Sequence, residues 1–266
     1  MNDSAVMVEN LEKRFGHFVA VDRVSFQVAR GEVFGFLGPN GAGKSTTIRM
    51  LCGILTPSGG RGTVAGFDVL SQPEQIKAHI GYMSQKFSLY SDLTVEENID
   101  FFSGIYRLPR EKKHDRKEWV IEMAGLAAHR HSLTGVLSGG WKQRLALGCA
   151  ILHEPPILFL DEPTSGVDPI SRRQFWDLIY DLSGLGVTVF VTTHYMDEAE
   201  YCNRLGLIYR GQLIALGTPH QLKTELSSDI RGAGQGTPAT PTLEDVFIAR
   251  IEAHDRAEPP EKESPR

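Results

Sequence analysis

A glycine-rich segment near residue 40 constrains this chain more than any other feature of its sequence. The segment Gly38-Pro39-Asn40-Gly41-Ala42-Gly43-Lys44-Ser45 fills every fixed position of the pattern Gly-x-x-x-x-Gly-Lys-Ser/Thr. An apolar run at residues 33–37 predicts a buried strand before it, and residues 45–51 predict a helix after it. In such a loop, backbone N–H groups and the positive end of the helix face a polyphosphate. The sequence therefore predicts a phosphate-binding loop.

The chemistry expected of this loop assigns roles to its last residues. Lys44 is predicted to reach the β- and γ-phosphates of a nucleotide, and the Ser45 hydroxyl to hold Mg²⁺. A second acidic element supports this interpretation, because the apolar run at residues 157–160 ends in Asp161 and Glu162. Asp161 is predicted to bind Mg²⁺ and Glu162 to polarise an attacking water.

The composition excludes several other classes of protein. The 266 residues carry a net charge of −5, so no excess of positive charge favours nucleic acid as a partner. No apolar stretch reaches the roughly 18 residues of a membrane span, and the N-terminus lacks the basic start and apolar run of a signal peptide. Cys52, Cys149 and Cys202 are widely spaced, and we expect them to be small core residues rather than disulfide or metal ligands.

Short apolar runs predict a β-rich start to the chain. We expect strands at residues 6–15, 19–21, 24–28 and 32–37, mostly antiparallel because their links are short. Further strands are expected at residues 80–83, 157–160 and 188–192, with a hairpin over residues 204–215.

Helical signals lie between these strands and near the C-terminus. Thr94 and Glu97 have the spacing of a capping box and open a helix, and Arg110–Ala124 is a charged amphipathic helix. Helices are also expected at residues 143–152, 169–183 and 243–253. The glycine- and proline-rich stretch 227–242 predicts a loose linker, and the charged stretch from Asp255 to Arg266 a disordered tail.

A third motif narrows the class of protein. Leu137-Ser138-Gly139-Gly140-Trp141 lies between the two phosphate elements, with Ser138 94 positions after Lys44, and leads into a helix. It resembles the Leu-Ser-Gly-Gly-Gln signature of ATP-binding cassette proteins. Trp141 departs from the usual Gln, while the three residues that would touch phosphate are intact. Gln85 resembles the Q-loop of that family, Asp168 in the run 165–168 its D-loop, and His194 its switch histidine. Phe15 resembles its adenine-stacking aromatic.

The resemblance covers roughly residues 5–225 and implies a set of site residues. His194 and Gln85 join Glu162 as catalytic residues, and Gln85 also joins Ser45 and Asp161 around Mg²⁺. ATP would be bound by Phe15, Gly38, Pro39, Asn40, Gly41, Ala42, Gly43, Lys44, Ser45, Thr46, Ser138, Gly139, Gly140 and Asp168. Because the signature serine and glycines of one subunit face the γ-phosphate held by another in this family, the resemblance also implies a dimer with two ATP molecules.

The implied fold is α/β: a P-loop NTPase with a mostly parallel core sheet, an N-terminal antiparallel β subdomain and a helical insert. The expected organisation is a cassette ATPase domain at residues 5–225 with its insert at about 90–150. A linker and C-terminal helix follow at 226–254, and then a tail at 255–266.

Several features resemble the type-2 bacterial exporter group of multidrug, antibiotic and lipid transporters: Trp141, residues 148–152, residues 164–169 and the run 241–247. The implied partners are a second cassette subunit, identical or closely related, and an integral membrane permease at the cytoplasmic face of the inner membrane. An importer subunit and a non-transport cassette ATPase remain alternatives. A pure nucleotide-binding regulator is disfavoured, because it would not need the base Glu162.

Overall fold

Two β-sheets form the centre of the part of the chain that the computed structural model describes, residues 4–232 and 241–257. The first sheet is antiparallel, with the order β2-β1-β4-β5. Its strands are β1 (Ser4–Phe15), β2 (Phe18–Ala29), β4 (Gly59–Val64) and β5 (Phe67–Asp68). This sheet is the predicted N-terminal antiparallel subdomain.

The second sheet has the order β10-β9-β3-β8-β7-β6, and each pair except β10 with β9 is parallel. Its strands are β3 (Val33–Leu37), β6 (Ile80–Met83), β7 (Ile157–Asp161), β8 (Thr188–Thr193), β9 (Arg204–Tyr209) and β10 (Gln212–Gly217). Every residue of β3, β7 and β8 is buried, as expected for central parallel strands covered on both faces. The mostly parallel α/β core predicted from the sequence is therefore confirmed.

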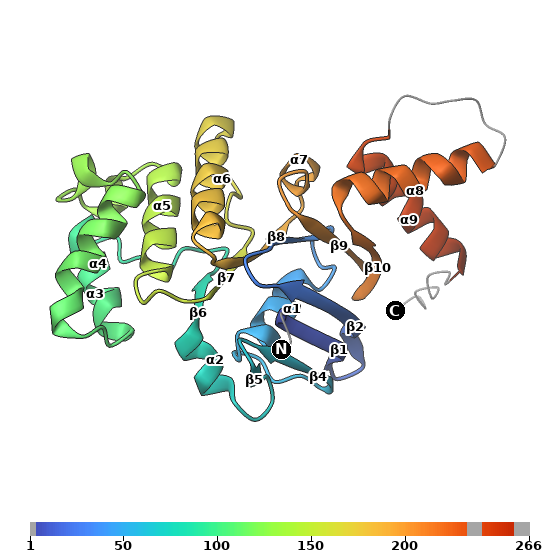
Figure 1. The fold of residues 1–266 in the computed structure, drawn as a ribbon, viewed down its shortest axis with the longest axis horizontal. Helices are drawn as coiled ribbons and strands as arrows, with labels where there is room; N and C mark the ends of the chain where they lie inside the picture. The colour runs from blue at the N-terminus through green and yellow to red at the C-terminus, as the bar shows by residue number, and fades with distance from the viewer. Residues whose placement is uncertain (1–3, 233–240, 258–266) are drawn as a thin grey trace, which may run out of the picture.

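The helical insert projects from one side of the parallel sheet. It contains α3 (Val95–Ile105), α4 (Arg110–Met123), the 3₁₀ turns Ala127–His129 and Thr134–Val136, and α5 (Gly139–Ala150). The predicted capping box is present: Thr94 Oγ1 accepts from the Glu97 N–H, and the Glu97 carboxylate accepts from the Thr94 N–H at 2.8 Å. The insert lies at one end of the molecule (Figure 1).

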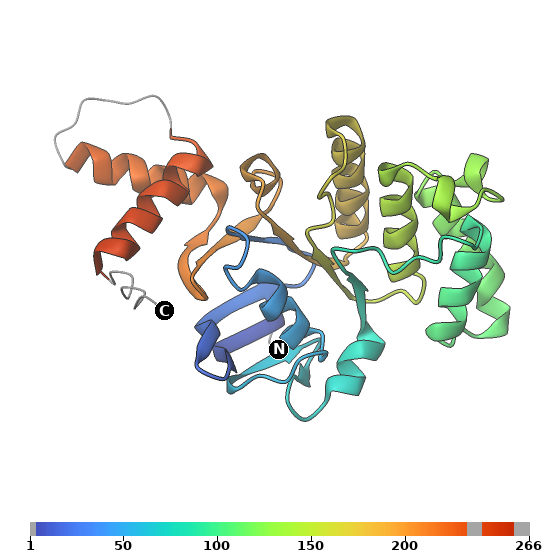
Figure 2. The same ribbon diagram turned by 180° about the vertical axis from the view of Figure 1, so that it is seen from behind.

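The remaining helices accompany the sheets. They are α1 (Lys44–Leu51), α2 (Pro73–His79), α6 (Pro169–Gly184), α7 (Met196–Ala199), α8 (Pro219–Gly232) and α9 (Leu243–Ala257). Helices α8 and α9 pack together at the end of the molecule opposite the insert (Figures 1 and 2). None of the helices within the described residues has both the length and the apolar character needed to cross a bilayer.

Three local predictions differ from the structure. The strands expected at residues 19–21 and 24–28 are one strand, β2, because the chain stays paired with β1 on both sides of Arg23, which adopts a left-handed φ of 49°. Helix α8 continues to Gly232, so the first part of the expected linker 227–242 is helical, and residues 233–240 lie outside the described residues. Helix α9 continues to Ala257, so Asp255 belongs to it rather than to the tail.

Two packing relations explain these extensions. Leu222 and Leu226 of α8 are buried in the main apolar core, which anchors the helix up to the residue before Ser227. Asp255 of α9 lies 3.0 Å from the Arg210 guanidinium and accepts from the Tyr209 hydroxyl at 3.3 Å. The rest of the predicted tail, residues 258–266, lies outside the described residues. All three cysteines are free and buried, as expected.

Candidate nucleotide-binding site

The phosphate-binding loop leaves the carboxyl end of β3 and enters α1. Lys44 opens this helix, and its side chain is only 3% exposed. Its ammonium group donates to the carbonyl oxygens of Gly38 at 2.7 Å and Pro39 at 3.0 Å. The loop thus curls around the lysine and holds it in place.

Two glycines of the loop are required by its geometry. Gly43, at the N-terminus of α1, has a φ of 106°, and a Cβ on it would lie 2.6 Å from the Ala20 carbonyl oxygen. A Cβ on Gly38 would lie 2.3 Å from the carbonyl oxygen of Ile208. The loop therefore fits closely between β2 and β9, and side chains at these positions would displace it.

The acidic end of β7 lies directly beside the loop. Ser45 Oγ donates to Asp161 Oδ1 at 2.9 Å, and Thr192 Oγ1 donates to the same oxygen at 2.8 Å. Thr192 lies at the end of the neighbouring strand β8, opposite Asp161 in the register. The serine and aspartate predicted to share a Mg²⁺ ion are therefore in contact.

Glu162 is the meeting point of the predicted catalytic residues. Its carboxylate lies 3.0 Å from Lys44 Nζ, accepts from Gln85 Nε2 at 3.1 Å and lies 3.2 Å from His194 Nδ1. The residue has a left-handed φ of 47°, an uncommon conformation outside glycine. Its N–H donates to Thr192 Oγ1 at 3.0 Å, which fixes this turn. The carboxylate is thus aimed at the loop rather than at solvent.

A cavity of about 390 Å³ lies over the loop. It is lined by Phe15, Phe18, Ala20, Asn40, Gly41, Gly43, Lys44, Ser45, Thr46, Gln85 and Glu162. Phe15 and Phe18 face each other across the β1–β2 hairpin and are 50% and 64% exposed. The Lys13 ammonium lies 5.1 Å from the Phe15 ring centroid and donates to the Thr56 carbonyl at 2.7 Å.

Phe18 is a cavity residue that the sequence analysis did not identify. Its only signal in the sequence is its spacing, three residues after Phe15 across a Gly-containing turn, which makes the two residues cross-strand neighbours.

The signature residues do not line this cavity. Ser138 caps α5 through a long contact of 3.5 Å from the Trp141 N–H, and a Cβ on Gly140 would lie 2.6 Å from Ser171 Oγ on α6. Asp168 caps α6 by accepting from the N–H groups of Ile170 and Ser171, and hydrogen bonds from Ser171 lower the pKa of its carboxyl. Contact of these residues with ATP therefore remains a prediction.

Trp141 packs within the insert rather than projecting freely. Its ring lies 4.5 Å from that of His129, and the Arg144 guanidinium lies 5.1 Å from its centroid. It also contacts the main apolar core. The large apolar area of Trp141 is therefore used for packing inside the insert.

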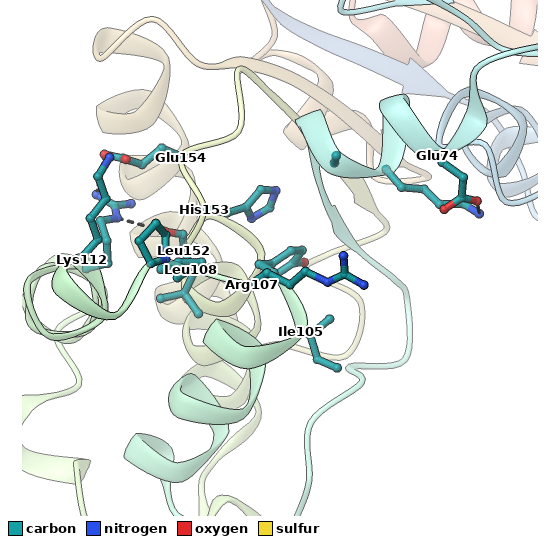
Figure 3. Close-up of a pocket in the computed structure, with 13 residues that line it drawn as sticks. Glu74, Ile105, Arg107, Leu108, Lys112, Leu152, His153 and Glu154 are labelled. Carbon is teal, nitrogen blue, oxygen red and sulfur yellow. Dashed lines mark hydrogen bonds and ion pairs between the residues drawn. The ribbon is translucent and has the colours of Figure 1, made fainter.

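A larger cavity of about 710 Å³ opens between α2 and the insert (Figure 3). Its wall includes Ile105, Arg107 and Lys112 from the α3–α4 corner and His153 after α5. The Tyr106 ring stacks on His153 at 3.8 Å, and burial raises the Tyr106 pKa to about 12. Tyr106 also lines a smaller cavity whose wall includes Ser84 and Phe87, on either side of Gln85 in the sequence.

Comparison with known proteins agrees with this architecture. The family model described as ABC transporter matches residues 21–165, and one described as AAA domain, putative AbiEii toxin, matches residues 137–196. Over 254 residues the chain is 50% identical to the probable multidrug ABC transporter ATP-binding protein YbhF of Escherichia coli (strain K12). The aligned region covers 96% of this chain and 43% of YbhF. It is 39% identical over 225 residues to the linearmycin resistance ATP-binding protein LnrL of Bacillus subtilis (strain 168), covering 84% of this chain and 72% of LnrL.

A solved structure of similar fold supports the same assignment. A dimeric ATP-binding cassette in a post-hydrolysis state, bound to ADP and phosphate, superposes with a TM-score of 0.72 at 26% identity, over 80% of this chain and 98% of that one. With the loop, the acidic strand end and the signature helix in place, the chain belongs to the ABC transporter family, as an ATP-binding cassette of P-loop NTPase fold. It spans less than half the length of YbhF.

Proposed function

We propose that this chain is the ATP-binding and ATP-hydrolysing subunit of a membrane exporter, in which closure of a cassette dimer drives transport through a separate membrane subunit. The observation that carries the proposal is the meeting of Lys44, Glu162, Gln85 and His194 at the loop, beside the Ser45–Asp161 contact. Relatives named for multidrug transport and linearmycin resistance support export over import.

ATP binding uses the loop and the aromatic hairpin. The polyphosphate is held by the loop N–H groups, Lys44 and Thr46, while the exposed face of Phe15 stacks on the base. Lys13 covers part of Phe15, and Phe18 supplies a second apolar contact at the same end of the cavity. Exposing two phenyl rings to water is unfavourable, and a bound base would cover them.

The oxygen groups near the loop fit Mg²⁺. This ion prefers a few oxygen ligands together with substrate phosphate, and Ser45 Oγ and Asp161 Oδ1 already lie 2.9 Å apart. Gln85, whose amide lies within contact distance of Glu162, would complete this set. When bound, the ion would neutralise charge on the phosphate oxygens.

Hydrolysis places Glu162 as the general base and His194 beside the γ-phosphate. Glu162 takes a proton from the water whose oxygen bonds to the γ-phosphorus, and the bond to the β–γ bridging oxygen breaks. His194 Nδ1 lies 3.2 Å from the same carboxylate, so both side chains can face one phosphoryl group. In the structure Lys44 is paired with Glu162, and the substrate phosphates replace that partner.

The second half of each site is assigned to a second subunit, identical or closely related. Ser138, Gly139 and Gly140 open α5, and the N-terminus of a 12-residue helix favours an anion. Because these residues do not line the cavity of their own chain, they are free to face ATP held by the partner. The dimeric state named for the ADP-bound cassette supports this arrangement.

The membrane subunit is assigned to the cavity between α2 and the insert. Lys77 pairs with Glu74 and Arg116 with Glu154, so among the described residues of its wall the cations that form no ion pair with a carboxylate are Arg107 and Lys112. Ile105 is 59% exposed at the same corner. An amphipathic helix with an acidic side chain fits this combination, and its docking places the cassette at the cytoplasmic face of the membrane.

The enzymatic part is tested by phosphate release from Mg-ATP by the purified full chain. We expect hydrolysis that Lys44→Ala abolishes and that Leu185→Ala, an exposed apolar position, leaves unchanged. Absence of hydrolysis, both by the chain alone and with its membrane subunit, would contradict the proposal.

The direction of transport needs the complete transporter. In inside-out vesicles an exporter accumulates an apolar fluorescent dye when ATP is added, whereas an importer does not. Ile105→Cys should crosslink to the co-purified membrane subunit. Leu185→Cys is the control and should not crosslink, although Leu185 is 70% exposed. The native cysteines are buried and give little background. Equal crosslinking at both positions would contradict the proposal that the membrane subunit docks at this cavity.

A further inference from the structure

The carboxylate of Glu198 is buried between three segments that carry site residues. It lies on α7 and is 0% exposed. Its Oε1 accepts a hydrogen bond from Thr164 Oγ1, and its Oε2 accepts one from Thr193 Oγ1 at 2.7 Å. Arg172 Nε of α6 lies 3.3 Å from Oε1. Burial raises the pKa of Glu198, and the two threonine hydrogen bonds act in the opposite direction.

The partners of Glu198 are the immediate neighbours of the proposed catalytic residues. Thr164 follows Glu162 by two positions, and Thr193 directly precedes His194. Glu198 therefore joins the turn after β7 to the last residue of β8, just beyond the point where the two strands stop pairing.

The connection through α6 leads to the signature segment. Arg172 is next to Ser171, whose hydroxyl occupies the space over Gly140. The Arg172 guanidinium also lies 4.1 Å from the ring centroid of Tyr195, the residue after His194. The Glu198 carboxylate thus contacts the segments that carry Glu162 and His194 directly, and it reaches the signature segment through Arg172 and Ser171.

A buried carboxylate would be energetically unfavourable at this position if its role were packing alone. Burying an ionised group is unfavourable unless its oxygens receive hydrogen bonds and a counter-charge. Here two threonine hydroxyls supply hydrogen bonds and the Arg172 guanidinium supplies the counter-charge. The three groups come from different segments, and contacts of this kind hold their members in one arrangement.

We propose that Glu198 is a positioning residue for hydrolysis, which holds the Thr164 and Thr193 segments together so that Glu162 and His194 face the same γ-phosphate. It touches neither the nucleotide cavity nor the loop, so its effect is on turnover and not on ATP binding. The inference rests on the proposed function, because it assumes that Glu162 and His194 act on ATP.

The test compares Glu198→Gln with Glu32→Gln in the full chain. Glu32 is a matched control: it is 8% exposed, it pairs with Arg204 at 3.3 Å, and it lies just before β3, at the end of the sheet away from the loop. We expect Glu198→Gln to lower kcat about 10- to 100-fold, with the KM for ATP changed less than about threefold. We expect Glu32→Gln to lower the melting temperature and leave kcat unchanged.

Threonine variants keep the inference testable if Glu198→Gln does not fold. Thr193→Val and Thr164→Val each remove one hydroxyl donor, and each should lower kcat in the same direction. Combined with Glu198→Gln, neither should add its full single effect, because the residues act through one network. A kcat equal to the wild type in the folded variants, or equal losses in Glu198→Gln and Glu32→Gln, would overturn the inference. A wild-type chain without ATPase activity would instead overturn the proposed function.

Discussion

The pairing of Lys44 with Glu162 makes a specific prediction about Glu162→Gln. The two groups lie 3.0 Å apart with side chains 3% and 7% exposed. Lys44 therefore has two alternative anionic partners, the Glu162 carboxylate without ATP and the phosphates with it. Replacing the carboxylate by a neutral amide of the same shape removes the first partner and the proposed base together.

The expected magnitudes follow from this competition. A contact involving a charged group contributes about 1.5–3 kcal/mol, and each 1.4 kcal/mol changes an equilibrium about tenfold. We therefore expect the Kd for ATP to fall about 10- to 100-fold in Glu162→Gln. Loss of the base should lower turnover on the order of 10²–10⁴-fold.

Two assays on one preparation separate these effects. Isothermal titration with a non-hydrolysable ATP analogue measures the Kd, and phosphate release measures turnover. A sizing column should then show an ATP-bound dimer that accumulates only in the variant. Turnover near the wild-type level would remove Glu162 as the base. An unchanged Kd beside lost turnover would refute the competition for Lys44.

Further predictions concern the signature and the C-terminus. Ser138→Arg should abolish hydrolysis by placing bulk at the helix end that faces the partner's ATP, as a phosphate-release assay would show. Trp141→Gln should keep activity within about tenfold, a barrier change under about 1.4 kcal/mol, because Trp141 packs inside the insert; a larger loss would assign it a direct role. Deleting residues 258–266 should leave the melting temperature unchanged, since they offer almost no apolar surface. Deleting residues 243–266 should lower it, because three apolar side chains of α9 are buried; equal melting temperatures would contradict this boundary.

The parts of the fold that could be predicted are those with a strong local signal. Strand β7 is a continuous apolar run, and the start of α3 has its capping box in the sequence itself. Strand β4 (Gly59–Val64) could not be found in this way, because half of its residues are glycines and its place is set by pairing with β1. The end of α8 was likewise hidden, since its Gly and Ser content resembles a linker while packing of Leu222 and Leu226 holds the helix.

The candidate site divides in the same way. Lys44 and Glu162 belong to motifs with fixed spacing, so their type and position could be predicted before any contact was known. Glu198 and Phe18 carry no such pattern. Their significance comes from contacts across the fold, Glu198 with Thr164 34 positions away and Phe18 with its cross-strand neighbour Phe15. Only the three-dimensional arrangement identifies residues of this kind.

The position of β3 in the parallel sheet has a consequence for synthesis of the protein. The strand that carries the phosphate-binding loop pairs with β8 on one side and β9 on the other, and Phe34 lies opposite Arg204. At about 5–20 residues per second, a ribosome needs on the order of ten seconds or more to deliver both neighbours after β3 has emerged. During that interval the five apolar residues of β3 have neither flanking strand. The antiparallel sheet of residues 4–68 can pair first. The phosphate-binding loop reaches its final position only after β9 has been made, at about residue 209, because Gly38 packs against Ile208. Translation pauses before this point would therefore expose β3 to aggregation or chaperone binding.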